Sequence, residues 1–121
     1  MAKIIVVDDS RILRTILTNN LTDAGHEIIG EAANGQELLD MLDTVTPDLI
    51  TLDITMPVMD GIEALKIIKD KYPDISVVMV SAAGQKDKVM ESLKTGANDF
   101  LQKPFEPDDV KHVVAKLVAK V

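Results

Sequence analysis

Short apolar runs alternate with amphipathic stretches along the whole chain. The apolar runs are rich in Ile and Val and are too short for helices, so each predicts a β-strand. These runs occupy residues 4–7, 28–33, 49–52, 77–80 and 100–102. Between the runs, apolar side chains recur with the three- and four-residue spacing of a helix that packs one face on a core. The clearest examples are Leu13, Ile16, Leu17 and Leu21, then Leu38, Met41, Leu42 and Val45, and finally Val110, Val113, Val114 and Leu117.

Glycine, proline and asparagine mark the expected helix ends. Gly25 and Gly96 suit the C-terminal ends of the first and fourth helices, and Pro47 suits the end of the second. Asn34 suits an N-cap, and Pro107 suits the first turn of the last helix. The order is five strand-then-helix units, which predicts an α/β fold with a five-stranded parallel sheet and five helices covering both faces.

Composition narrows the class of protein. The chain has 121 residues, of which 46% are hydrophobic and 27% are charged, so we expect one globular domain over residues 1–121. The apolar runs are too short to span a membrane and no secretory signal is visible, so we expect a cytoplasmic monomer without membrane insertion. The chain has no Cys, which excludes disulfides and zinc-thiolate sites.

Charge narrows the choice of partner. The net charge is −7, from 13 basic and 20 acidic side chains, so we expect no nucleic-acid partner. The carboxylates are concentrated before residue 85 and the lysines after it. The last predicted helix uses the remaining residues, so we expect output through protein docking rather than through a second domain.

Charged and polar residues follow the apolar runs at four of the predicted strand ends. Asp8 and Asp9 follow the first run, Asp53 the third, Ser81 the fourth and Lys103 the fifth. In an open parallel sheet, ligand chemistry collects at the carboxyl ends of the strands, near the point where the strand order reverses. In the doubly wound order 2-1-3-4-5, strands one and three are neighbours, so the three aspartates should meet across one crevice.

A cluster of carboxylates needs a proton, a cation or both, because the negative charges repel one another. Oxygen ligands in a wet site suit Mg²⁺ better than zinc, and Mg²⁺ favours a phosphate oxygen as a further ligand. Lys103 and the Ser81 hydroxyl would supply a cation and a donor for that phosphate. Carboxylates can accept phosphoryl groups, and Asp53, at the end of the central strand, is the expected acceptor. The chain lacks a glycine-rich GxxxxGKS or GxxxxGKT loop, so the donor should be another phosphorylated molecule.

Five segments resemble one known family, in order and with the spacing of that family. They are residues 6–10 (VVDDS), 52–61 (LDITMPVMDG), 80–82 (VSA), 96–97 (GA) and 103–105 (KPF). Over its whole length the chain resembles the receiver domains of two-component response regulators. Within the family it is most similar to the single-domain chemotaxis regulators. The resemblance implies a flavodoxin-like fold.

The resemblance also implies a role for each acidic residue. Asp53 would accept a phosphoryl group from a CheA-like histidine kinase. Asp9 and Asp53 would bind Mg²⁺ directly, Asp8 would act through water, and the backbone carbonyl of Thr55 would be a further ligand. The protein would be a signalling protein that catalyses only its own phosphoryl transfer and autodephosphorylation.

Further family positions fall on the fourth and fifth strands. Lys103, Ser81 and Ala82 would surround the phosphoryl group, and Ser81 would move toward it. Phe100 matches an aromatic switch position that is usually Tyr, so without a hydroxyl it would act by packing alone; the alternative for Phe100 is a plain core residue. The peptide bond between Lys103 and Pro104 resembles a cis bond of the family.

The expected output surface consists of the fourth helix, the fifth strand and the fifth helix. A flagellar motor switch protein or a phosphatase would dock there, which would place the protein in chemotaxis and the control of flagellar rotation. The C-terminal part of the chain is rich in lysine, and the candidates on this surface are Lys86, Lys88, Lys94, Lys111 and Lys116. We therefore expect a partner with an acidic segment.

Other protein classes stay open on the residues alone. A single-domain phosphorelay intermediate, or a receiver cut from a longer regulator, would carry the same motifs. An aspartyl-nucleophile magnesium phosphatase usually has a second acid two residues after the nucleophile, where this chain has Thr55. A flavin-binding module would need a Ser, Thr or Gly phosphate loop after the first strand, where this chain has Asp8, Asp9 and Ser10.

Overall fold

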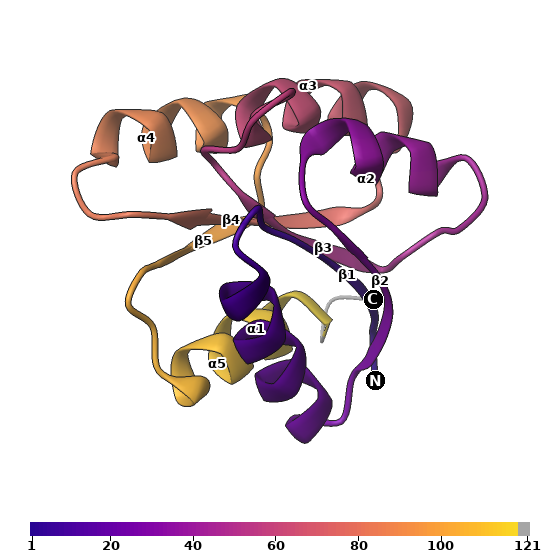
Figure 1. Cartoon of the computed structure of the whole chain (residues 1–121), viewed down its shortest axis with the longest axis vertical. Helices are drawn as coiled ribbons and strands as arrows, with labels where there is room; N and C mark the ends of the chain where they lie inside the picture. Colours follow the sequence, from indigo (N-terminus) through magenta and orange to yellow (C-terminus); the bar gives the residue numbers. More distant parts are fainter. Residues whose placement is uncertain (119–121) are drawn as a thin grey trace.

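A parallel sheet lies between two layers of helices in the computed structural model, which describes residues 1–118 (Figure 1). The strand order is β2-β1-β3-β4-β5, which confirms the predicted topology. The strands are β1 (Lys3–Val7), β2 (Glu27–Ala32), β3 (Leu49–Asp53), β4 (Ser76–Ser81) and β5 (Asp99–Gln102). The helices are α1 (Arg11–Asp23), α2 (Gly35–Leu42), α3 (Gly61–Lys71), α4 (Lys86–Thr95) and α5 (Pro107–Val118).

Alternating strand residues supply the two faces of the core. Helices α1 and α5 cover one face of the sheet, and α2, α3 and α4 cover the other (Figure 1). In β1, Ile5 and Val7 pack on the side of α2, α3 and α4, while Ile4 and Val6 pack on the side of α1 and α5. Both sides of the central strands are therefore apolar, as expected for a parallel sheet that is buried on two faces.

Short polar caps start three of the helices. The side chains of Ser10, Asn34 and Asp60 each accept a hydrogen bond from a backbone N–H one turn into the helix that follows, at 3.3, 2.9 and 2.9 Å. A cap satisfies a backbone donor that the first helical turn leaves free. The chain therefore reverses close to the carboxyl edge of the sheet, where the polar residues at the strand ends remain accessible.

Two details of the helices differ from the predictions. Helix α2 ends at Leu42, well before Pro47, because the backbone N–H groups of Thr44 and Val45 both donate to the Met41 carbonyl and form a turn. Val45 packs on the core from this turn rather than from the helix. In α1, Ile16 was expected in the core but is 43% exposed, because Leu17 and Leu21 fill the space against the sheet.

No helix within residues 1–118 has the length and hydropathy needed to cross a bilayer. The predicted last helix extended to the end of the chain, and residues 119–121 of that prediction lie outside the described residues.

Candidate functional site

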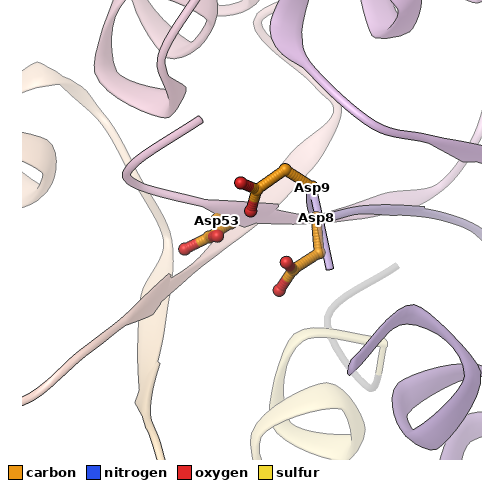
Figure 2. A group of neighbouring side chains, drawn as sticks. All are labelled: Asp8, Asp9 and Asp53. Atoms are coloured by element: carbon orange, nitrogen blue, oxygen red, sulfur yellow. The ribbon is translucent and has the colours of Figure 1, made fainter. Parts of the chain in front are cut away.

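Three aspartates from two neighbouring strand ends meet at the carboxyl edge of the sheet. Asp8 and Asp9 follow β1 directly, and Asp53 is the last residue of β3, which pairs with β1 in parallel. One carboxylate oxygen from each aspartate lies within 4.8 Å of the other two (Figure 2). Two negative charges at this separation repel by about 3–4 kcal/mol at an effective dielectric constant near 20. The arrangement therefore favours a bound cation.

Lys103 places one positive charge among these carboxylates. It follows β5 immediately, and its Nζ lies 3.3 Å from Asp8 Oδ2 and 3.5 Å from Asp53 Oδ2. A single ammonium group cannot balance three carboxylates. We refer to Asp8, Asp9, Asp53 and Lys103 as the acid pocket.

Asp53 is the carboxyl group whose proton affinity changes most clearly in the fold. Its residue is only 5% exposed. Burial is the largest cause that raises its pKa from 3.8 to about 6, the charge of Asp8 raises it further, and Lys103 opposes both. At neutral pH the group is mostly ionised, so it has the lone pairs of a nucleophile together with a raised basicity.

A buried oxygen of Asp8 supports cation binding in the acid pocket. Asp8 is 1% exposed, and its Oδ1 accepts a hydrogen bond from the backbone N–H of Ser10 at 2.8 Å. Its Oδ2 is buried but has no hydrogen-bond partner among the described residues, although Lys103 lies within ion-pair distance. A buried oxygen with spare lone pairs beside two more carboxylates is a donor set that fits Mg²⁺. The three aspartates could therefore hold this ion.

Close packing of α3 fixes the backbone of Asp53. The backbone N–H of Gly61, the first residue of α3, donates to the Ile54 carbonyl at 2.7 Å. A methyl group on Gly61 would overlap the backbone carbonyl oxygen of Asp53, so a side chain cannot be accommodated without a shift. The glycine is thus required by the approach of the helix to the strand end.

The other predicted residues lie at the end of β4 and on the loops that follow β3 and β4. Ser81 ends β4 and is 2% exposed, and its hydroxyl is directed toward the Leu101 carbonyl at 3.5 Å, at the limit of a hydrogen bond. Ala82 and Thr55 lie on exposed loops, immediately after β4 and two residues after Asp53.

The structure also shows the surroundings of Phe100 and the geometry of the turn that follows β5. Phe100 is 39% exposed, so the interpretation of Phe100 as a core residue is wrong. Its ring lines a cavity of about 350 Å³ between α4 and β5, together with Val89 and Leu93. The peptide bond between Lys103 and Pro104 is cis.

Two polar side chains near the acid pocket, Arg14 and Gln85, are not predicted from the sequence. Arg14 donates to the Asp8 backbone carbonyl at 2.6 Å and pairs with Glu31 at 3.4 Å. Gln85 donates to the Thr55 hydroxyl and accepts from the Ala82 N–H, each at 2.7 Å. Arg and Gln are ordinary residues of exposed surfaces, so nothing in the sequence pattern singles out Arg14 or Gln85.

Comparison with known proteins identifies the family. The family model described as "Response regulator receiver domain" matches residues 4–115. The chain belongs to the response-regulator receiver domain family. The chemotaxis protein CheY of Listeria monocytogenes is 46% identical to this receiver domain over 116 residues, covering 96% of this chain and 98% of that protein.

Further similarities agree with this assignment. The chemotaxis protein CheY of Thermotoga maritima is 41% identical over 115 residues, covering 95% of this chain and 96% of that protein. The crystal structure of the receiver domain of NtrX from Brucella abortus has a TM-score of 0.92 and 32% sequence identity, covering 98% of this chain and 99% of that chain. The predicted family and fold are therefore confirmed.

Proposed function

We propose that this receiver domain takes a phosphoryl group from the phosphohistidine of a CheA-like histidine kinase onto Asp53, in an Mg²⁺-dependent reaction. The observation that carries the proposal is the acid pocket, in which a buried, ionised Asp53 lies beside two further carboxylates and a lysine. Relatives named chemotaxis protein CheY support a role in chemotaxis.

The proposed chemistry is one displacement at phosphorus. An oxygen of the Asp53 carboxylate forms the new P–O bond, and the P–N bond to the histidine of the kinase breaks. The histidine nitrogen keeps the electron pair of the broken bond, and the ring leaves as a neutral imidazole because its other nitrogen carries a proton. Later attack of water on phosphorus releases inorganic phosphate and restores the carboxylate.

The proposed roles of the surrounding residues follow from their charges and donors. Mg²⁺ held by Asp8, Asp9 and Asp53, with the Thr55 backbone carbonyl, would neutralise charge on the transferring phosphoryl group. The other oxygens of the phosphoryl group need hydrogen-bond donors. Lys103 supplies a cation, and we assign the remaining donor roles to the Ser81 hydroxyl and the Ala82 N–H.

The proposed output is a change on the surface formed by α4, β5 and α5. The phosphoryl group adds about 1.5–2 negative charges at one point, and Lys103 and Ser81 would shift toward it. The Phe100 ring would then turn into the cavity beside α4. A flagellar motor switch protein or a phosphatase with an acidic segment would recognise this surface through lysines such as Lys94.

Intact mass spectrometry after incubation with acetyl phosphate and Mg²⁺ tests the proposed acceptor. We expect one added phosphoryl group on the unmodified sequence, and none after Asp53→Asn or in the presence of a chelator. Asp70→Asn is the matched control, because Asp70 is an exposed carboxyl group on α3 outside the acid pocket. If Asp53→Asn gained the label at the rate of the control, another residue would be the acceptor and the proposal would fail.

A further inference from the structure

One side-chain amide connects the loops that follow β3 and β4. The Oε1 of Gln85 accepts the backbone N–H of Ala82 at 2.7 Å, and the Nε2 of the same residue donates to the Thr55 hydroxyl at 2.7 Å. Ala82 belongs to the loop between β4 and α4, and Thr55 belongs to the loop between β3 and α3. Gln85 therefore joins segments that are 30 residues apart in the chain.

We propose that Gln85 is a latch: its amide occupies the Ala82 N–H in the unphosphorylated protein and releases it when a phosphoryl group is bound to Asp53. This inference rests on the function proposed above and adds a regulatory residue to the same site.

The position of the Ala82 N–H makes it a donor for that phosphoryl group. β3 and β4 are paired so that Asp53 lies opposite Val80, and Ala82 is two residues further along. The Ala82 N–H donates to the Oε1 of Gln85, and the Nε2 of the same amide donates to Thr55. The Ala82 N–H is therefore directed across the gap between the two loops, toward the loop that follows Asp53. A phosphoryl group on the Asp53 side chain would lie beside this gap.

The competition between the two acceptors favours the phosphoryl group. A backbone N–H has one hydrogen, so it cannot serve Gln85 and a phosphoryl oxygen with good geometry at the same time. A hydrogen bond to an anionic oxygen is about twice as strong as one to a neutral amide oxygen. The Gln85 amide is only partly buried, so after release water can satisfy both of its polar atoms.

Release of the latch would act directly on the start of α4. Gln85 immediately precedes this helix, and its backbone carbonyl accepts the Val89 N–H at 3.0 Å. Its side chain makes no capping hydrogen bond to the helix, because it is used by the Ala82 N–H and the Thr55 hydroxyl. Gly84, with φ of +84°, lets the chain turn back so that the amide reaches the loop.

Gln85 also lies beside the surface of α4 and β5, which belongs to the proposed output surface. Gln85 lines the cavity of about 350 Å³ that also contains Phe100 and Leu93. Opening the latch frees the loop of residues 82–85 from Thr55 and leaves the start of α4 free to move relative to β5. Gln85 thus links occupancy of the acid pocket to the surface of α4.

Equilibrium binding of beryllofluoride, an analogue of the phosphoryl group, tests the latch in the presence of Mg²⁺. The signal is the backbone amide of Ala82, followed by ¹⁵N NMR in the full chain. Each hydrogen bond of the latch contributes a modest net stability, so Gln85→Ala should bind beryllofluoride about three- to tenfold more tightly than the unmodified sequence. In the free Gln85→Ala protein, the Ala82 resonance should already have lost the shift that the amide acceptor causes.

The controls separate the latch from a general effect of the substitution. Gln36→Ala removes another glutamine amide, which donates to Asp40 at 3.1 Å on the exposed face of α2, and should bind with unchanged affinity. Thr55→Val removes the second anchor with little change in shape. Without the Thr55 hydroxyl, the Gln85 amide is no longer held in place on the Ala82 N–H, so the gain from Gln85→Ala should be smaller in the Thr55→Val background.

The outcomes distinguish the latch from the proposed function. Wild-type affinity in Gln85→Ala, with beryllofluoride still bound at Asp53, would overturn the latch and leave the proposed function intact. Failure of every variant, including the unmodified sequence, to bind beryllofluoride would overturn both. Fully additive effects of Gln85→Ala and Thr55→Val would also contradict a shared latch.

Discussion

At the scale of single residues, the carboxyl group of Asp53 makes the stability of the fold depend on pH. Its pKa is raised from 3.8 to about 6, first by burial and then by the charge of Asp8. The folded protein therefore binds this proton more tightly than the unfolded chain does. The stability that this group contributes is fully present below pH 3.8 and is lost as the pH rises through about 6.

Asp53→Asn should remove this pH dependence. In the presence of a chelator, the free energy of unfolding of the variant should rise relative to the unmodified sequence by about 2–3 kcal/mol between pH 4 and pH 7. Urea unfolding at several pH values measures the difference, with Asp70→Asn as the control. Parallel stability profiles for the unmodified sequence and Asp53→Asn would show that burial does not raise this pKa.

Val58 is held in a rare backbone conformation near the site. Its φ is +68°, and the backbone N–H of Met59 donates to the Pro57 carbonyl at 2.7 Å, which makes Val58 the centre of a tight γ-turn. A β-branched residue is strained at positive φ, and this side chain is 82% exposed, so it gains little from burial.

Val58→Asn should therefore increase stability by about 1 kcal/mol, because asparagine tolerates positive φ. Thermal unfolding measures the change. Ile12→Asn provides the comparison, since Ile12 is also exposed, at 74%, but lies in α1 with ordinary helical geometry, and its replacement should give no gain. A loss of stability in Val58→Asn would show that the valine side chain makes contacts that outweigh the strain.

At the scale of elements, the start of α3 packs tightly against the end of β3. Gly61→Ala would place a methyl group on the Asp53 carbonyl oxygen, so either the helix or the strand end must shift. We expect a loss of about 2–4 kcal/mol and slower phosphorylation by acetyl phosphate.

Gly25→Ala is the control for Gly61→Ala. Gly25 has φ of +92° but no atom near the added methyl group, so its replacement should reduce stability without changing the phosphorylation rate. Equal phosphorylation rates for Gly61→Ala and the unmodified sequence would show that α3 does not position the acceptor.

The elements themselves were largely predictable, because each strand is a short apolar run and the helices between them carry apolar side chains at helical spacing. Every strand end was predicted to within one residue, since apolar runs in a doubly buried sheet are bounded by polar residues. The end of α2 was not predictable from periodicity, because Val45 continues the apolar spacing from a turn that packs on the core. Tertiary packing, rather than helix geometry, keeps that side chain buried.

The acid pocket was predictable for a topological reason. Parallel strands bring their carboxyl ends to one edge, so residues at the ends of β1, β3 and β5 must approach one another once the strand order is known. The Gln85 contacts were not predictable in this way. They depend on the conformation of two loops and on one side-chain rotamer, and neither is encoded in a periodic pattern.

At the scale of the whole molecule, a cation bound by the three aspartates would couple the acid pocket to the stability of the fold. Ions that bind only the folded protein stabilise it, by about 2.7 kcal/mol at a hundred times their dissociation constant. Mg²⁺ should therefore raise the unfolding temperature of the unmodified sequence, and removal by a chelator should reverse the rise.

Asp9→Asn should weaken this effect, because Asp9 is an exposed member of the acid pocket and its replacement leaves the core intact. Asp70→Asn should respond to Mg²⁺ as the unmodified sequence does. Calorimetric unfolding across a range of Mg²⁺ concentrations measures both responses. An unfolding temperature that does not depend on Mg²⁺ would contradict cation binding by the three aspartates.

The central claim is that Asp53 becomes an acyl phosphate, and chemical trapping tests it most directly. Borohydride reduces an aspartyl phosphate to homoserine, which remains in the chain and is located by peptide mass spectrometry. After incubation with acetyl phosphate and Mg²⁺, we predict homoserine at position 53 alone, and none when Mg²⁺ is removed. Homoserine at position 8 or 9, or stable phosphorylation elsewhere with an unreduced Asp53, would contradict the account.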